Sequence, residues 1–123
     1  MAREHLIPGP DHPITITPAD VRVVVSVDGK VVADTSQALV LQEASYPPVY
    51  YVPLGDIDPH ALVASETRTY CPYKGDAIYY SVPSPDGEIH DAAWAYPEPY
   101  PEVADIASHA AFYPDRVEIT AEG

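Results

Sequence analysis

Apolar and polar residues alternate with a period of two along most of this chain, and that period is typical of β-strands. The clearest example is a pair of β-branched runs, residues 21–27 and 30–35, which are separated by Asp28 and Gly29. An Asp-Gly pair between two such runs favours a type I′ hairpin. The odd-numbered valines of the first run share one face with Val32, and we expect that face to lie in the core.

Shorter patterns of the same kind continue to the end of the chain. They predict strands at residues 38–43, 49–52, 67–70, 77–82, 88–96, 111–113 and 117–119, with a strand-like segment at residues 14–17. Two short helices are expected, one at residues 59–64 after the N-cap residue Asp58, and one at residues 102–108. We therefore expect a mainly β fold, with about eight short strands in one curled antiparallel or mixed sheet. This single compact domain would span residues 14–123 and follow an N-terminal arm at residues 1–13.

Composition and charge narrow the classes of partner. The chain has 19 acidic and 6 basic residues, which give a formal net charge of -13. Nucleic acids and anionic membranes are bound through Lys and Arg, so we expect no nucleic-acid partner and no membrane partner. The N-terminal residues lack the apolar segment of a signal peptide, so a cytoplasmic location is expected. Cys71 is the only cysteine, which excludes an internal disulfide.

Proline and tyrosine are unusually frequent, at 15 and 10 residues. Prolines spread among apolar segments indicate short elements joined by fixed turns. A tyrosine combines an apolar ring with a polar hydroxyl, so it fits the core of a small domain and also the wall of a binding pocket. The sequence leaves both interpretations open.

Reactive side chains are densest in residues 69–75, which read Thr-Tyr-Cys-Pro-Tyr-Lys-Gly. A nearby cation stabilises a thiolate. In one interpretation Cys71 is a nucleophile, and Lys74 activates it or holds a carboxylate or phosphate group. In the other, Cys71 is a buried structural residue beside a Pro-Gly turn.

Glu43 is the second candidate, because it lies in line with Leu39 and Leu41 on a predicted strand. A carboxylate in that position lies either at a strand end or in a cleft. Lys74 and several aromatic residues could line such a cleft with it, namely Tyr51, Tyr80, Trp94 and Tyr96. Arg22 or Arg116 could meet an anionic group of a ligand beside Lys74.

Metal and cofactor signals are weak. The five histidines show no metal-binding spacing, and neither a phosphate-binding loop nor a dinucleotide-binding glycine motif occurs. We expect no metal site, and the cofactor, if any, is unknown.

Six motifs are distinctive when taken together: Glu43-Ala-Ser45, Pro48-Val-Tyr-Tyr-Val-Pro53, Thr69-x-Cys-Pro-Tyr-Lys-Gly75, Tyr79-Tyr-Ser-Val82, Ala92-Ala-Trp-Ala-Tyr-Pro97 and Ala111-Phe-Tyr-Pro-Asp-Arg-Val117. They resemble the bacterial "domain of unknown function 427" family over nearly the whole chain. The resemblance implies a tent-like β fold akin to the Mss4-type and methionine sulfoxide reductase folds. It also implies one site bordered by Glu43, Tyr51, Thr69, Cys71, Lys74, Tyr80 and Trp94. The family is sometimes labelled a nucleotidyltransferase, although this chain lacks the Gly-Ser element expected ahead of paired aspartates in those enzymes.

Three functions remain open. The first is a domain that binds a small polar or anionic molecule in a Tyr-lined pocket, where Lys74 meets an anionic group and Glu43 a polar or cationic one. The second is a group-transfer enzyme that uses Cys71 or a Lys74–Glu43 pair. The third is an interaction module, such as a homodimer, that pairs through a β edge or an exposed Tyr patch. If Glu43 and Lys74 lay on opposite surfaces, the first hypothesis would fail.

Overall fold

The hairpin expected at Asp28 and Gly29 is present in the computed structural model, which describes residues 3–122. Strand β2 (Arg22–Val27) pairs with β3 (Lys30–Thr35). Asp28 and Gly29 have φ angles of 50° and 82°, and a type I′ turn requires positive φ at both positions. The odd-numbered valines from Val23 onwards are buried together with Val32, which confirms the predicted core face.

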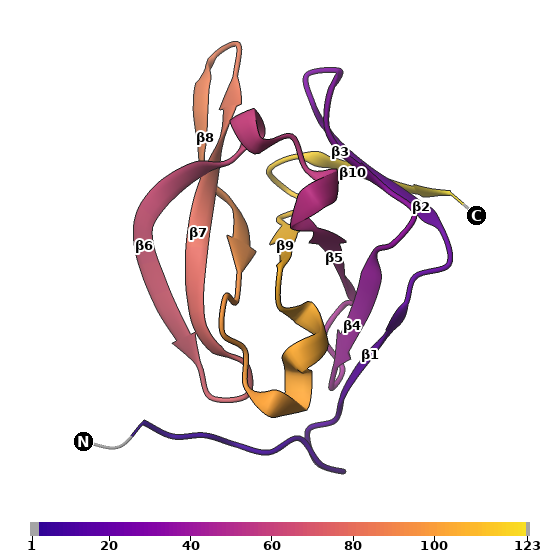
Figure 1. Cartoon of the computed structure of the whole chain (residues 1–123), viewed down its shortest axis with the longest axis vertical. Helices are drawn as coiled ribbons and strands as arrows, with labels where there is room; N and C mark the ends of the chain where they lie inside the picture. Colours follow the sequence, from indigo (N-terminus) through magenta and orange to yellow (C-terminus); the bar gives the residue numbers. More distant parts are fainter. Residues whose placement is uncertain (1–2, 123) are drawn as a thin grey trace.

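In the described part of the chain, ten antiparallel strands form two sheets, so the expected mainly β class is confirmed (Figure 1). The larger sheet has the order β1-β4-β5-β9-β8-β7-β6, and the smaller has the order β10-β2-β3. The remaining strands are β1 (Ile14–Pro18), β4 (Leu39–Glu43), β5 (Val49–Pro53), β6 (Val63–Cys71), β7 (Gly75–Ser84), β8 (Gly87–Ala95), β9 (His109–Phe112) and β10 (Glu118–Glu122). The larger sheet curls, so that β6 and β7 lie on one side of Figure 1 and β1 and β4 on the other.

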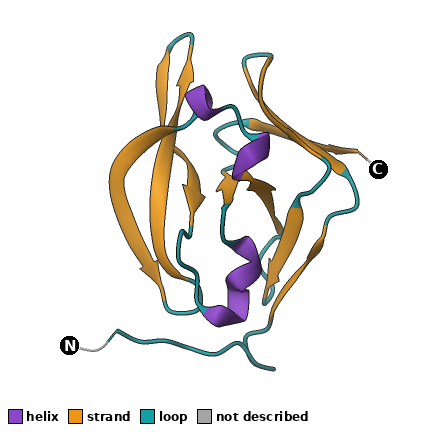
Figure 2. Ribbon diagram, viewed as in Figure 1, coloured by secondary structure: helices purple, strands orange, loops and turns teal. Residues whose placement is uncertain are grey.

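Helical structure within residues 3–122 is limited to short 3-10 turns (Figure 2). They are η1 (Leu54–Asp56), η2 (Pro59–Ala61) and η3 (Pro101–Ile106). Asp58 caps η2 as predicted, because its side chain accepts a hydrogen bond from His60 N at 2.9 Å. The helix expected at residues 59–64 is nevertheless too long: Leu62 is already extended, and residues from Val63 onwards pair with β7 instead. None of these helices is long and apolar enough to cross a membrane.

Two buried clusters lie on opposite faces of β5 and β9, since successive residues of a strand point to opposite sides. Val52 and Ala110 belong to the first cluster, together with the valines of β2. Tyr51 and Ala111, their immediate neighbours, belong to the second cluster, which packs against η3. The candidate functional site described below lies on this second face.

The N-terminal arm packs along the turn between β6 and β7, at the bottom of Figure 1. Leu6 N donates a hydrogen bond to Pro72 O at 2.9 Å, and Arg3 forms an ion pair with Asp76. The ring of His5 stacks on Tyr100 at a centroid distance of 3.6 Å. Of the arm expected at residues 1–13, residues 1 and 2 lie outside the described residues.

Candidate functional site

Glu43 and Lys74 form an ion pair, although they lie 31 residues apart in the chain. Lys74 Nζ donates a hydrogen bond to Glu43 Oε1 at 2.5 Å. The side chain of Lys74 is only 9% exposed and that of Glu43 only 16%, so both charges are largely removed from water. The two residues therefore lie together in one site, not on opposite surfaces.

The turn between β6 and β7 fixes the position of Lys74. Lys74 N donates to Cys71 O at 3.2 Å, and Tyr100 N donates to Lys74 O at 3.0 Å. Gly75 follows with a φ of 112°, which L side chains rarely adopt. A Cβ at this position would lie 3.4 Å from Glu98 O, an ordinary van der Waals contact, so the need for glycine comes from the backbone conformation.

His12 is the third member of the cluster. Its Nε2 lies 2.7 Å from Glu43 Oε2, and the imidazole donates because an ionised carboxylate can only accept. Its ring stacks on Tyr73 at 4.1 Å with an interplanar angle of 8°. Sequence reasoning missed His12, since it lies in an arm that has no periodic pattern and no motif pointing to Glu43.

Glu43 is held as a carboxylate by these two neighbours. Burial raises the pKa of Glu43, but the hydrogen bonds from Lys74 and then His12 outweigh burial and leave the pKa below its ordinary value. The site therefore contains a fixed negative charge with a fixed positive charge beside it at neutral pH.

The ion pair lies in the wall of a cavity of about 260 Å³, which we call the Glu43 pocket. Aromatic side chains dominate the wall. The lining residues are Leu41, Glu43, Tyr46, Pro47, Val49, Tyr51, Lys74, Tyr79, Trp94, Tyr96 and Tyr113.

Two lining residues of the Glu43 pocket, Tyr79 and Trp94, lie side by side on neighbouring strands. Tyr79 of β7 pairs with Trp94 of β8, which pairs with Ala111 of β9. Trp94 Nε1 donates a hydrogen bond to the Tyr51 hydroxyl at 3.3 Å, and the two rings meet edge to face. This bond fixes the indole orientation.

Burial keeps the hydroxyls of Tyr51, Tyr96 and Tyr113 neutral. Burial raises the pKa of Tyr51 and that of Tyr96. Burial, and then the neighbouring Tyr79, raises the pKa of Tyr113 to about 12. The ring of Tyr96 also lies 5.9 Å from Lys74 Nζ, within the range of a cation–π contact. The wall thus offers uncharged hydrogen-bonding groups around the one ion pair.

Cys71 and Thr69 lie beside the pocket and are not among its lining residues. Cys71 is half-buried against the second cluster, and its Sγ lies 3.6 Å from Lys74 Nζ. Thr69 Oγ1 lies 2.9 Å from the hydroxyl of Tyr79, so Thr69 contacts a wall residue from outside.

Three other candidates lie elsewhere in the structure. Tyr80 packs against the first core cluster, on the face of β7 opposite to Tyr79. Arg22 forms an ion pair with Asp34 at 2.5 Å, and Arg116 lies in the loop after β9. The structure therefore does not bring these three side chains to the Glu43 pocket.

Tyr79 and Tyr113 were not among the sequence candidates. For Tyr79 a signal was present, because Ile78, Tyr80 and Val82 share one face of the strand predicted at residues 77–82, and alternation then places Tyr79 on the opposite face. For Tyr113 no such signal existed, since it follows the end of β9 and its position depends on the tertiary fold.

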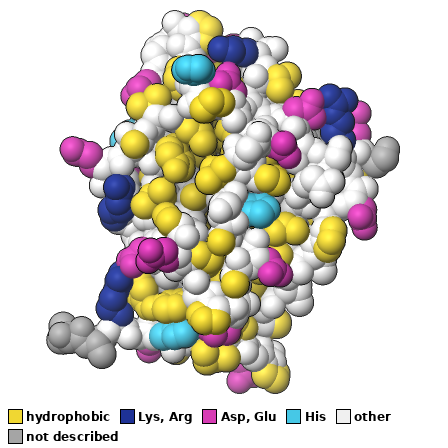
Figure 3. Space-filling model, viewed as in Figure 1, with side chains coloured by type: hydrophobic (Ala, Val, Ile, Leu, Met, Phe, Trp, Pro, Cys, Tyr) yellow, Lys and Arg dark blue, Asp and Glu magenta, His cyan; other side chains and the backbone are white. Residues whose placement is uncertain are grey.

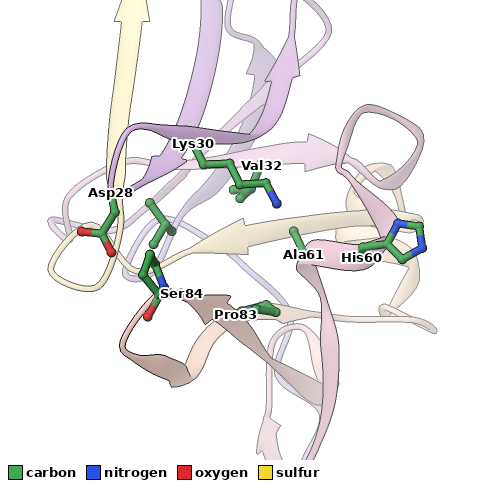
Figure 4. Close-up of a pocket in the computed structure, with 9 residues that line it drawn as sticks. Asp28, Lys30, Val32, His60, Ala61, Pro83 and Ser84 are labelled. Carbon is green, nitrogen blue, oxygen red and sulfur yellow. The ribbon is translucent and has the colours of Figure 1, made fainter.

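A second cavity of similar size lies between the β2–β3 turn and the β7–β8 turn, at about 290 Å³ (Figure 4). Asp28, Lys30, His60 and Ser84 are its polar residues, and Figure 4 shows Asp28 and His60 at opposite ends. The side chain of His60 is 94% exposed. Its polar groups do not converge as Glu43, Lys74 and His12 do, so we assign the candidate site to the Glu43 pocket.

The fold and the site define a small mainly β domain with an ion pair in an aromatic-walled pocket. The chain belongs to the family described as domain of unknown function DUF427, whose sequence profile matches residues 15–123. The resemblance drawn from the six motifs is thereby confirmed. None of the curated proteins compared with the chain matches it. Within residues 3–122, no cluster of three His, Cys, Asp or Glu side chains is arranged to hold a metal ion.

Proposed function

We propose that this domain binds a small polar molecule in the Glu43 pocket. The ammonium of Lys74 donates to an acceptor or anionic group of the ligand, and the carboxylate of Glu43 accepts from a polar or cationic group. The observation that carries the proposal is the largely buried Glu43–Lys74 pair in the wall of a 260 Å³ cavity. A few placed polar groups within an aromatic wall are typical of small-molecule sites.

Stability alone is a poor explanation for the ion pair. Removing two charges from water costs several kcal/mol, and apolar residues of similar volume are often at least as stabilising as a buried pair. Glu43 and Lys74 are surrounded by apolar and aromatic side chains that could have filled the same space. An ion pair in the wall of a cavity is better explained by ligand binding, because a ligand can replace part of the hydrogen bonding between the two side chains.

Charge balance limits the polar group of the ligand. Glu43 and Lys74 already neutralise each other at 2.5 Å, so a ligand group with a net charge would leave one uncompensated charge in a half-buried site. A neutral group with a donor and an acceptor, or a zwitterion, meets both residues without that cost. Amides and α-amino acids have this chemistry.

A thermal-shift screen tests the proposal. The panel holds amino acids, amides, nucleosides, nucleotides, sugar phosphates and simple carboxylates. A ligand at a hundred times its dissociation constant adds about 2.7 kcal/mol of stability, which for a domain of this size raises Tm by several degrees. Glu43→Gln and Lys74→Met should lose the shift, whereas Glu88→Gln, which changes an exposed carboxylate of β8, should retain it. A panel without any hit, or hits that survive both pocket variants, would contradict the proposal.

A group-transfer enzyme is the second candidate, and the 3.6 Å contact between Cys71 Sγ and Lys74 Nζ is the observation that favours it. A thiolate stabilised by Lys74 reacts rapidly with iodoacetamide near neutral pH. Under this alternative the folded wild type reacts faster than a free thiol of ordinary reactivity, and Lys74→Met slows it. Slow reaction in both proteins would leave only a mechanism based on Lys74 and Glu43.

A further inference from the structure

The Glu43 pocket adjoins a second hollow of about 500 Å³, which we call the apolar groove. Five residues line both cavities: Tyr46, Pro47, Val49, Trp94 and Tyr113. The remaining wall of the groove consists of Pro48, Tyr50, Phe112, Pro114 and Ile119. None of these ten residues carries a charge at neutral pH, so the groove complements an apolar group.

The shared part of the wall is held rigidly. The rings of Trp94 and Tyr113 lie 4.4 Å apart, and the indole of Trp94 is fixed by its hydrogen bond to Tyr51. Three prolines, whose backbone φ is fixed, also line the groove: Pro47, Pro48 and Pro114. Because the side chains of such a wall are already ordered, they lose little further conformational entropy when a ligand binds.

We propose that one ligand occupies both cavities, with an aromatic ring in the apolar groove and a neutral or zwitterionic polar group at Glu43 and Lys74. This inference rests on the proposed function, which it extends by naming the class of ligand. Adjacency carries it, because five residues line both cavities and a ligand bound beside Lys74 therefore lies next to the groove.

The shape of the groove favours an aromatic ring over a flexible chain. Apart from Val49 and Ile119, its lining consists of rings of tyrosine, tryptophan, phenylalanine and proline, and a flat ring can lie against such surfaces in stacked or edge-to-face contact. A ring also has few rotatable bonds to immobilise, whereas each bond of an alkyl chain adds to the entropic cost.

Matched probe pairs test the inference by NMR titration. L-phenylalanine is compared with L-alanine, and 3-phenylpropanamide with propanamide, so that each pair shares one polar group and differs in the ring. Burial of the ring should tighten binding on the order of tenfold or more within at least one pair. Amide signals of Tyr50, Phe112 and Ile119 should shift only with the aromatic member.

Two variants separate the groove from the rest of the surface. Ile119→Ala removes part of the groove wall and should weaken the aromatic probe several-fold without changing the small one. Val31→Ala is the matched control. Val31 belongs to the same small sheet as Ile119, is 50% exposed and lies outside the groove. It should leave both affinities unchanged.

The outcomes distinguish this inference from the proposed function. If both members of each pair bind equally and lose affinity in Lys74→Met, the ring site is wrong and the proposed function stands. If an aromatic probe binds in the groove and Lys74→Met does not change its affinity, both this inference and the proposed function are wrong for that class of probe. Such small probes are expected to have dissociation constants of about 1 mM. If none of the four binds at about ten times that concentration, the inference of an aromatic ligand with this polar group is overturned.

Discussion

At the residue scale, the central feature is a carboxylate that is surrounded by apolar groups and yet remains ionised. Glu43 has two donors, Lys74 Nζ at 2.5 Å and His12 Nε2 at 2.7 Å. These donors come from the β6–β7 turn and from the N-terminal arm, so the charge of Glu43 links three separate segments. Changes at Glu43 should therefore affect both stability and its pH dependence.

The lowered pKa of Glu43 predicts how its contribution varies with pH. A carboxyl whose pKa is lower in the folded state contributes stability above its ordinary pKa and loses it as pH falls through the folded pKa. The loss in free energy of unfolding caused by Glu43→Gln should thus be fully present at about pH 5.5 and above and should shrink towards pH 3. Urea unfolding at several pH values measures it, with Glu88→Gln as the control. A difference that stays constant or grows towards pH 3 would show that Glu43 is not held as an ion by its partners.

Removal of one partner of the ion pair should cost more than removal of both. Lys74→Met leaves Glu43 largely buried without its main counter-charge, and we expect a loss of about 2–4 kcal/mol in the free energy of unfolding. The double variant Glu43→Gln, Lys74→Met has no unpaired charge and should recover at least half of that loss. Urea denaturation of the single and double variants measures both values. Additive losses would mean that the pair is energetically uncoupled.

At the element scale, the β6–β7 turn positions Lys74 through the backbone of Gly75. Gly75→Ala forces a Cβ into a φ of 112° and to 3.4 Å from Glu98 O. We expect a loss of about 1–3 kcal/mol and a disturbed ion pair, because such backbone strain typically costs that much. Gly55→Ala is the matched control: Gly55 lacks a positive φ, and its Cβ would meet nothing within 4 Å. Chemical denaturation of the two variants should give clearly different midpoints, and equal midpoints would contradict this account of the turn.

The elements also show how far the sequence was informative. The Asp28-Gly29 hairpin and most strands were predictable, since turn chemistry and alternation are local signals. The helix predicted after Asp58 was not formed beyond Ala61, because pairing of β6 with β7 outweighs a local cap. Such pairing between distant segments leaves no local signal in the chain.

For the site, the sequence indicated which charged residues matter, but it was harder to predict which side chains of a strand face the pocket. Glu43 was singled out because it lies in line with core residues of a predicted strand, and Lys74 because it is the cation near Cys71. The structure brings the two side chains together. Tyr80 was chosen where Tyr79 lines the pocket, although the two alternate on one strand and only one can face each side. Long-range contacts such as that of His12 with Glu43 depend on how the arm packs.

At the scale of the whole molecule, acidic side chains are spread over the surface while the pocket holds a balanced pair. Figure 3 shows one face, where hydrophobic side chains gather near the middle and acidic ones are dispersed around them. A net charge of -13 repels anions at long range, so recognition of an anionic group would depend on Lys74 at close range.

The arm closes one side of the site and should control access to Cys71. Removal of residues 1–13 eliminates the His12 contact with Glu43 and the hydrogen bond of Leu6 to Pro72, next to Cys71. We expect the truncated domain to stay folded, with a free energy of unfolding lower by about 1–3 kcal/mol. Cys71 should then react several-fold faster with iodoacetamide. His12→Ala, which keeps the arm, should change the rate less, and equal rates in all three proteins would show that the arm does not cover the thiol.

The central claim is that the Glu43–Lys74 pair recognises a ligand in the pocket, and Trp94 allows a direct measurement. Trp94 is the only tryptophan and lines the Glu43 pocket, so a bound ligand should change its fluorescence. The measurement is a fluorescence titration of the best ligand of the screen against wild type, Glu43→Gln, Lys74→Met and Val31→Ala. The account predicts a saturable change in wild type and Val31→Ala, with affinity at least about tenfold weaker in each pocket variant, as expected for the loss of one charged hydrogen bond. Equal affinity in all four proteins would contradict it.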